Sequence, residues 1–133
     1  YTYTKEGLKQ DRYVKGIICG NDDLASQAFR ALSEERLAGK VYVTGQDGDL
    51  AACQRIVEGT QEMTAFKSVE QEASMAAKCA VLLGLGEEIE EARSTAYDRT
   101  YQVPYLVLQP IPVPGENMDE VIIPGGFHAN EAV

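Results

Sequence analysis

Short apolar runs alternate along the chain with longer segments in which apolar residues recur every three or four positions. The runs "VKGIICG", "KVYVTG" and "EMTAF" are rich in β-branched residues and bounded by turn residues, which is typical of buried parallel strands. The predicted elements are strands at 14–20, 40–45 and 62–66, and helices from Asp22 or Asp23 to Gly39, from Asp49 to Gly59 and over 68–86. This alternation predicts right-handed βαβ units and an α/β fold with a parallel sheet.

The same pattern predicts the ends and the buried faces of these helices. Asp22 or Asp23 is expected to cap the first helix and Asp49 the second, because a side-chain oxygen can accept a bond from the first turn. The side chains predicted to face inward are Leu24, Ala25, Ala28, Phe29 and Leu32 in the first helix, and Leu50, Cys53, Ile56 and Val57 in the second. The third helix has a broad face rich in alanine.

The last third of the chain is less regular. Residues 87–102 are acidic and weakly periodic, which predicts a loop or a short helix. Residues 103–113 are expected to be extended, and their prolines place part of the segment at a sheet edge or between domains. The tail after it mixes turns with one short apolar run, and its histidine, His128, is expected to be a surface residue without a partner.

Composition narrows the classes of function. The 133 residues suit one ordinary domain, and the net charge of -9 argues against nucleic acid and anionic membranes as partners. Three cysteines without a CxxC spacing, and a single histidine, do not make a zinc site. Cys19 and Cys53 are interpreted as small core residues, and we expect no disulfide within the chain.

Three polar residues follow directly on the three predicted strands: Asn21, Asp47 and Lys67. Because ligands of an open parallel sheet bind beyond the carboxyl ends of its strands, these side chains are expected to converge on one cleft. A carboxylate accepts bonds from two hydroxyls, an amide donates and accepts, and an ammonium donates three times. The set therefore predicts a site for a neutral, hydroxyl-rich ligand, with no metal, no cofactor and no catalytic residue.

Structural explanations for these residues remain open. Asp47 could be a turn residue, and Lys67 alone would be an ordinary solvated lysine. A calcium loop from Asp47 to Glu58 is rejected, because its fifth and sixth positions are alanines where such loops need a ligand and a glycine. No phosphate-binding loop, dinucleotide fingerprint or nucleophile elbow occurs. A small enzyme on a flavodoxin-like sheet is thus a weaker hypothesis than a binding protein.

The stretches "GQDGDLA", "QRIVEGTQEMT" and "DEVIIPGGFH" resemble the D-xylose-binding proteins of bacterial ABC transporters, a family of type I periplasmic sugar-binding proteins. By position, Asn21, Asp47 and Lys67 match sugar-contacting residues of that family's carboxyl-terminal half. Departures occur beside Lys67, where Phe66 and Ser68 replace the usual tyrosine and proline. A further departure is "DLASQ" after Asn21, where small residues are usual. These departures leave the particular sugar open.

The resemblance implies a Rossmann-like lobe that is incomplete relative to the two-lobed family. Residues 1–66 would form the βαβαβ unit of the carboxyl-terminal lobe, 67–108 would cross to the other lobe, and 109–133 would be the return strand and tail. The apolar face of the helix at 68–86 would then need the missing amino-terminal half or a second copy of the chain as its cover.

The implied function is binding of a pentose or similar monosaccharide as the extracytoplasmic solute-binding component of an ABC transporter, with no enzymatic activity. Its partners would be the sugar and an ABC permease. The alternative is a sugar-sensing input module for a signalling kinase or a transcriptional regulator, whose partner would be a membrane sensor. A repressor would need a DNA-binding segment, which this sequence does not contain.

Overall fold

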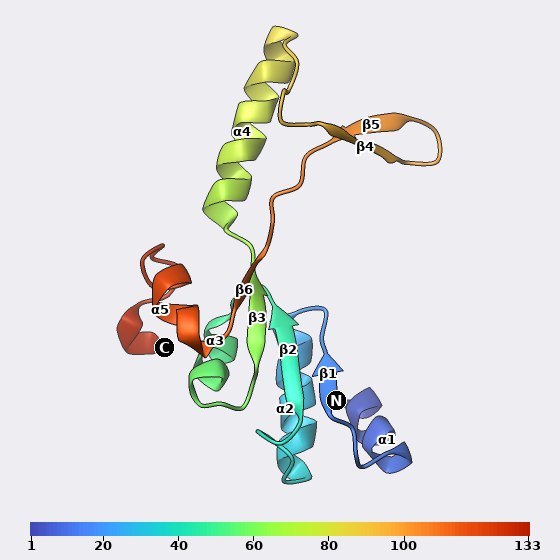
Figure 1. The fold of residues 1–133 in the computed structure, drawn as a ribbon, viewed down its shortest axis with the longest axis vertical. Helices are drawn as coiled ribbons and strands as arrows, with labels where there is room; N and C mark the ends of the chain where they lie inside the picture. Colours follow the sequence, from blue (N-terminus) through green and yellow to red (C-terminus); the bar gives the residue numbers. More distant parts are fainter. The chain divides into compact units, whose positions relative to one another are not determined.

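The computed structural model describes all 133 residues of the chain. They form two compact units, one made of residues 1–66 with 111–133 and the other of residues 67–110 (Figure 1). The first unit contains the sheet and most of the helices, and the second contains one long helix and a hairpin.

The first unit is built on a four-stranded sheet in the order β1-β2-β3-β6. Strands β1 (Gly16–Ile18), β2 (Tyr42–Gln46) and β3 (Met63–Phe66) are parallel, as the sequence predicts. The fourth strand, β6 (Ile111–Val113), runs antiparallel to β3, so the sheet is mixed rather than wholly parallel. Pro112 lies within β6, where an edge strand tolerates a residue that cannot donate to a further neighbour.

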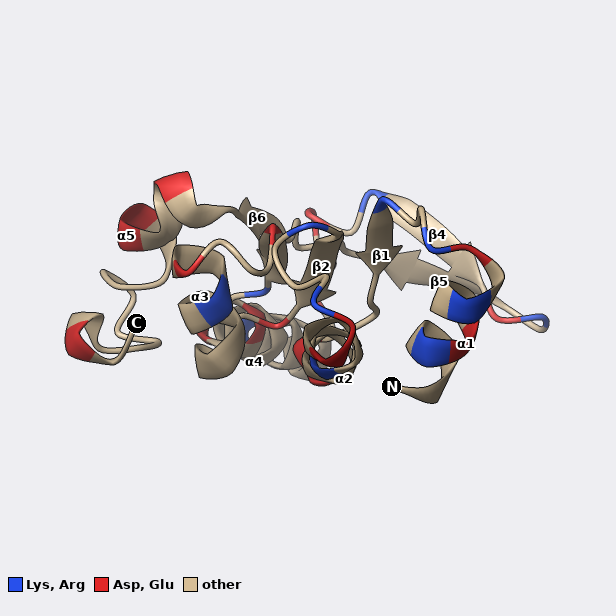
Figure 2. Ribbon diagram, turned by 90° about the horizontal axis from the view of Figure 1, so that it is seen from below, with Lys and Arg blue, Asp and Glu red and all other residues tan.

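Helices cover this sheet mainly on one side. The helical elements of the first unit are α1 (Thr2–Gln10), α2 (Asp22–Glu34), α3 (Leu50–Val57) and α5 (Met118–Val121), with short 3₁₀ turns at Gly115–Asn117 and Asn130–Ala132. Viewed along the strands, α2 and α3 lie on the same side of the sheet, and α5 lies beyond the edge strand β6 (Figure 2). Because β1, β2 and β3 are parallel, their carboxyl ends lie together at one end of the sheet.

The first helix, α1, was not predicted, because its sequence buries only Leu8 and lacks an apolar stripe. Polar contacts attach it to α2 instead. The Lys5 ammonium lies 3.2 Å from a carboxylate oxygen of Glu34 and 2.8 Å from one of Glu35, and the Tyr1 hydroxyl donates to Glu34 at 2.6 Å. Such pairs depend on residues about thirty positions away, so local periodicity does not report them.

The core forms two clusters beneath the sheet. One contains Leu8, Ala25, Leu32, Val41 and Val43, and the other contains Cys53, Ile56, Phe66, Val113, Met118 and Ile122. The predicted inward positions are confirmed for Ala25, Ala28, Leu32, Cys53 and Ile56. They are wrong for two residues: Leu24 is 57% exposed and Val57 is 59% exposed.

The error at Leu24 has a specific cause. The sequence pattern assigns the acidic start of α2 to solvent, but Asp22 is fully buried. Because helical residues three and four apart share a face, burying Asp22 selects the face of Ala25 and Leu32 and turns Leu24 outward. A carboxylate in the interior is unusual enough that hydrogen bonds must compensate for the loss of its water.

The second unit begins with a well-delimited helix, α4 (Val69–Leu85). The Ser68 hydroxyl oxygen accepts a bond from the Gln71 N–H at 3.3 Å and caps its start, while Gly86, at φ +75°, ends it. No residue of α4 is buried, and Leu85 is 68% exposed. None of the helices in the chain is both long enough and apolar enough to cross a membrane.

Residues 94–105 form a hairpin, so the predicted loop or short helix over 87–102 is wrong in its second half. Strands β4 (Ser94–Tyr97) and β5 (Gln102–Tyr105) pair antiparallel. The turn is held by Asp98, whose Oδ1 accepts bonds from the N–H groups of Thr100 and Tyr101 at 2.8 and 2.7 Å. The acidic residues before β4 dominate the local sequence pattern, so the short strands of the hairpin give no clear periodic signal of their own.

Candidate functional site

A tight turn after β2 presents the candidate ligand residue Asp47. Its backbone has two consecutive positive φ angles, +105° at Asp47 and +77° at Gly48. Positive φ is uncommon for a residue with a Cβ, although aspartate tolerates it better than most. The Asp47 N–H donates to the Ala65 carbonyl at 3.0 Å, which ties the turn to the neighbouring strand β3.

The buried carboxylate of Asp22 holds this turn from below. Its Oδ2 accepts bonds from the N–H groups of Gly48 and Asp49 at 2.9 and 3.0 Å, and from the Thr64 hydroxyl at 2.8 Å. Its Oδ1 accepts a bond from Gln61 Nε2 at 3.1 Å. Asp22 is thus a structural anchor that joins the start of α2 to the turn after β2 and to the first half of β3, a role that the sequence interpretation missed.

Asn21 caps α2, which corrects the prediction that Asp22 or Asp23 does so. The Asn21 Oδ1 accepts a bond from the Leu24 N–H at 2.9 Å. This leaves its two amide N–H groups as the donors that Asn21 can offer to a ligand. The loop before Asn21 is tied to the end of β2, because Gln46 Nε2 donates to the Gly20 carbonyl at 3.4 Å. Asn21 and Asp47 therefore follow adjacent parallel strands at the same sheet edge.

Lys67 follows immediately after Phe66, the last residue of β3, and is the first residue of the second unit. Its backbone position at the carboxyl end of β3 agrees with the predicted pattern of one polar residue after each parallel strand. The meeting of its ammonium with Asn21 and Asp47 in one cleft stays a prediction. Lys67 and Asp47 are both half-buried, so neither side chain is fully solvated.

The region around the turn is strongly acidic. Partial burial, together with the neighbouring carboxylates of Asp22, Asp23 and Asp47, raises the pKa of Asp49 above that of an ordinary aspartate. These carboxylates do not form a group with the arrangement of a metal site. Their collective charge instead disfavours anionic ligands at this edge and suits a neutral ligand with hydroxyl donors.

A buried polar chain extends behind the site. Arg55 Nε donates to Gln61 Oε1 at 3.0 Å, and Gln61 in turn donates to Asp22. The Arg55 guanidinium lies 5.6 Å from the centre of the Phe29 ring. Burial lowers the pKa of Arg55, although the nearby acidic groups oppose that shift. Gln61 therefore links the Arg55 side chain to the Asp22 carboxylate through two hydrogen bonds.

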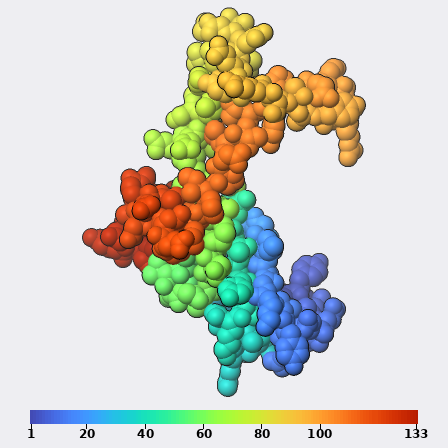
Figure 3. Space-filling model, viewed as in Figure 1, coloured from blue at the N-terminus to red at the C-terminus, as the bar shows by residue number.

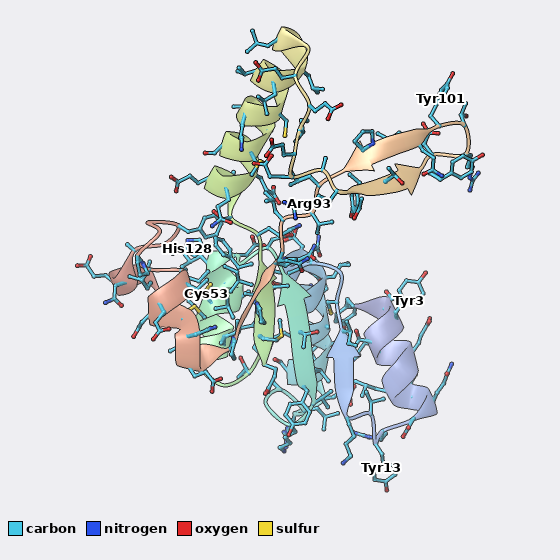
Figure 4. All side chains as sticks on the ribbon, turned by 45° about the horizontal axis from the view of Figure 1, so that its top comes forward. Tyr3, Tyr13, Cys53, Arg93, Tyr101 and His128 are labelled. Atoms are coloured by element: carbon cyan, nitrogen blue, oxygen red, sulfur yellow. The ribbon has the colours of Figure 1, made fainter.

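His128 is the second correction that bears on the site. It was expected to be a surface residue without a partner, but it is half-buried and its Nε2 lies 2.7 Å from the Gly48 carbonyl oxygen. Cys53 Sγ approaches the same oxygen at 3.5 Å, and both side chains are seen near the sheet end in Figure 4. The tail therefore contacts the turn that presents Asp47.

The reactivity of Cys53 should reflect its place under this turn. All three cysteines are free, Cys53 is fully buried, and Cys19 and Cys79 are half-buried. Burial raises the pKa of the Cys53 thiol to about 11, so only roughly one thiol in a thousand is ionised at pH 8. In the native chain we expect iodoacetamide to alkylate Cys53 last, as read by peptide mass spectrometry. Equal rates at Cys53 and Cys79 before unfolding would contradict this burial.

Comparison with known proteins identifies the family. Residues 1–88 match the family described as periplasmic binding protein domain. The chain is 42% identical over 120 residues to the D-xylose-binding periplasmic protein of Haemophilus influenzae, covering 90% of this chain and 36% of that protein. It is 41% identical over 115 residues to the D-xylose-binding periplasmic protein of Escherichia coli, covering 86% and 34% of the two chains.

A solved structure agrees with these sequence matches. The carbohydrate transporter solute-binding protein from Chloroflexus aurantiacus, crystallised in complex with D-glucose, matches 98% of this chain and 39% of its own with a TM-score of 0.84 and 26% identity. The fold is therefore that of the type I periplasmic binding proteins. The chain belongs to the periplasmic binding protein domain family, and it spans about a third of the length of its curated relatives.

Proposed function

We propose that this chain supplies one face of a monosaccharide site in the solute-binding component of an ABC transporter. The observation that carries the proposal is the position of Asn21 and Asp47 after adjacent parallel strands, in a domain of this family. Two relatives of the chain are D-xylose-binding periplasmic proteins, which supports a pentose or a similar neutral sugar as the ligand.

Each proposed ligand residue has a distinct role. The Asp47 carboxylate accepts bonds from two neighbouring sugar hydroxyls, and the Asn21 amide donates to a hydroxyl oxygen because its own oxygen already caps α2. Lys67 donates from the end of β3. These groups replace the water that a sugar gives up on binding. Because the sugar has no charge, the carboxylates around the turn do not repel it.

Binding of this kind forms and breaks no covalent bond and needs no cofactor. Sugar capture relies on hydrogen bonds and on closure of two lobes around the ligand. We propose that the second unit, residues 67–110, belongs to the segment that crosses to the other lobe, and that an amino-terminal lobe or a second chain covers the exposed apolar residues of α4. An ABC permease would be the membrane partner, and the protein would act outside the cytoplasmic membrane.

Heteronuclear NMR titration of the chain with D-xylose tests the proposal directly. We expect saturable shifts at the amides of Asn21, Asp47 and Gly48, and no comparable shifts in the hairpin at 94–105. D-ribose and D-glucose serve as comparison sugars, and mannitol serves as an open-chain polyol control. Shifts that stay linear in sugar concentration, or that spread evenly over the chain, would overturn the proposed site.

Asp47→Asn should weaken sugar binding by about 1–3 kcal/mol, because the sugar hydroxyls would lose a charged hydrogen-bond acceptor. Asparagine keeps the shape of the side chain and tolerates the φ of +105° at this position. The matched control is Asp119→Asn, which removes one exposed carboxylate from α5. Dissociation constants from the same titrations decide the outcome, and equal affinities for the two variants would count against Asp47.

A further inference from the structure

Gly48 is the point at which three segments of the first unit meet. Its N–H lies 2.9 Å from Asp22 Oδ2 and 3.1 Å from Thr64 Oγ1, and its carbonyl oxygen lies 2.7 Å from His128 Nε2. A carbonyl oxygen can only accept, so His128 donates its Nε2 hydrogen to it. The interior therefore holds the peptide group before the Gly48 Cα. The peptide group after it is held by the interior through the Asp49 N–H and by the tail through the Gly48 carbonyl.

Phe127 reinforces the contact at the end of the neighbouring strand. Its ring packs edge-on against the ring of Phe66 with centroids 5.0 Å apart and planes inclined at 61°. A Cβ built on Gly48 would lie 2.9 Å from Phe66 and 3.6 Å from Phe127, so both rings close over that glycine. The dipeptide Phe127–His128 thus touches the turn that carries Asp47 and the residue that precedes Lys67.

The tail is itself anchored on both sides of this dipeptide. Before it, Ile122 is fully buried and Met118 is 2% exposed in the core cluster beside Phe66. After it, the Ala132 carbonyl accepts a bond from Gln54 Nε2 of α3 at 2.7 Å. In Figure 3 the tail, coloured red, lies against the green surface of α3 and β3. Because the tail is anchored on both sides, Phe127 and His128 are kept in place against the turn.

The turn needs such support from outside. Two consecutive residues with positive φ, one of them carrying a Cβ, form a conformation that costs free energy and persists only when the surroundings impose it. A shift of this turn would move the Asp47 carboxylate, and binding by several hydrogen bonds requires each acceptor to be correctly placed. The contacts of the tail therefore bear on ligand affinity as well as on stability.

We propose that Phe127 and His128 are positioning residues for sugar binding: they hold the Asp47–Asp49 turn and the end of β3 in the arrangement that binds the ligand. This inference rests on the proposed function, since it takes the Asp47 carboxylate to be a sugar contact. It assigns a role to a carboxyl-terminal tail that lies eighty residues beyond the turn in the sequence.

Two variants separate the hydrogen bond from the volume of the His128 side chain. His128→Leu removes the donor, whereas His128→Gln keeps an N–H donor near the position of Nε2. We expect the first to weaken D-xylose binding by about 3- to 10-fold in the NMR titration and the second to restore most of it. Melting temperatures of both variants are recorded, and Glu131→Gln, an exposed change in the same tail, is the control.

A second readout does not depend on sugar. The ring nitrogen shifts of His128 in the wild-type chain should show the hydrogen of the neutral imidazole on Nε2, and the Gly48 and Asp49 amide signals should move in His128→Leu but return in His128→Gln. Phe127→Ala should also weaken D-xylose binding, by about 3-fold or more, through loss of the ring contact with Phe66.

The outcomes distinguish the two hypotheses. If the wild-type chain shows no saturable shift with any sugar, the proposed function fails and the inference fails with it. If the wild-type chain binds D-xylose and His128→Leu binds it equally well, the inference alone is overturned. Lower melting temperatures for His128→Leu and His128→Gln with unchanged sugar affinity would likewise overturn the inference, because the tail would then have a purely structural role.

Discussion

Replacing Asp22 with alanine is expected to lower the free energy of unfolding of the first unit by about 3–5 kcal/mol, the range seen when one partner of a buried charged network is removed. The carboxylate is fully buried and accepts four hydrogen bonds. Alanine would remove the acceptor of the Asp49 N–H and the Thr64 hydroxyl, whereas the Gly48 N–H keeps Thr64 Oγ1 and Gln61 Nε2 keeps the Met63 carbonyl. Each buried group left unsatisfied costs about 1–3 kcal/mol before the structure relaxes.

The Asp22→Ala experiment follows the first unit rather than the whole chain. Hydrogen exchange at the amides of β2 and β3 reports the unfolding of the sheet itself, independently of residues 67–110. Asp23→Ala is the matched control, since Asp23 is an exposed aspartate in the same first turn of α2. A loss at Asp22→Ala no larger than at Asp23→Ala would show that the network does not stabilise the sheet.

Asp22→Asn refines the same prediction. The amide keeps the volume of the carboxylate but replaces one acceptor oxygen with a donor, which would face a backbone N–H or the Gln61 amide. We expect a loss of stability close to that of the alanine variant. If instead asparagine is tolerated, the contribution of Asp22 comes from filling space and not from accepting hydrogen bonds.

Local periodicity was sufficient for the elements that flank the site. The three parallel strands and helices α2, α3 and α4 were predicted because each repeats apolar residues with the period of its secondary structure. The strand-end positions of Asn21, Asp47 and Lys67 follow from those boundaries. The orientation of α2 did not follow, because hydropathy assigns Asp22 to solvent while four hydrogen bonds hold it in the interior.

The missed features depend on contacts between distant residues. His128 is bonded to a residue eighty positions earlier, and α1 is held by ion pairs about thirty positions away, so no window of sequence contains both partners. One signal was nevertheless present. Gly45 lies within a β-strand, where a glycine often marks close approach of another group, and here that group is the Asp22 carboxylate.

Gly45→Ala should therefore destabilise the first unit by about 2–4 kcal/mol, through overpacking together with loss of hydrogen bonds. A Cβ at this position would lie 2.0 Å from Asp22 Oδ1 and 3.1 Å from Gln61 Nε2. The carboxylate cannot swing aside without breaking its bonds to the Asp47–Asp49 turn. Gly7→Ala is the control, because nothing lies within 4 Å of its Cβ position in α1 and alanine is expected to stabilise the helix by about 0.5–1 kcal/mol.

Combining Gly45→Ala with Asp22→Ala tests whether the two effects have one cause. If the added methyl group destabilises the sheet by colliding with the carboxylate, removing the carboxylate removes the collision, and the double variant should be little worse than Asp22→Ala alone. A double-mutant cycle of hydrogen-exchange free energies measures this coupling. Additive losses would mean that the added methyl group does not act by colliding with Asp22. Gly45 would then be required for a reason other than the close approach of the Asp22 carboxylate.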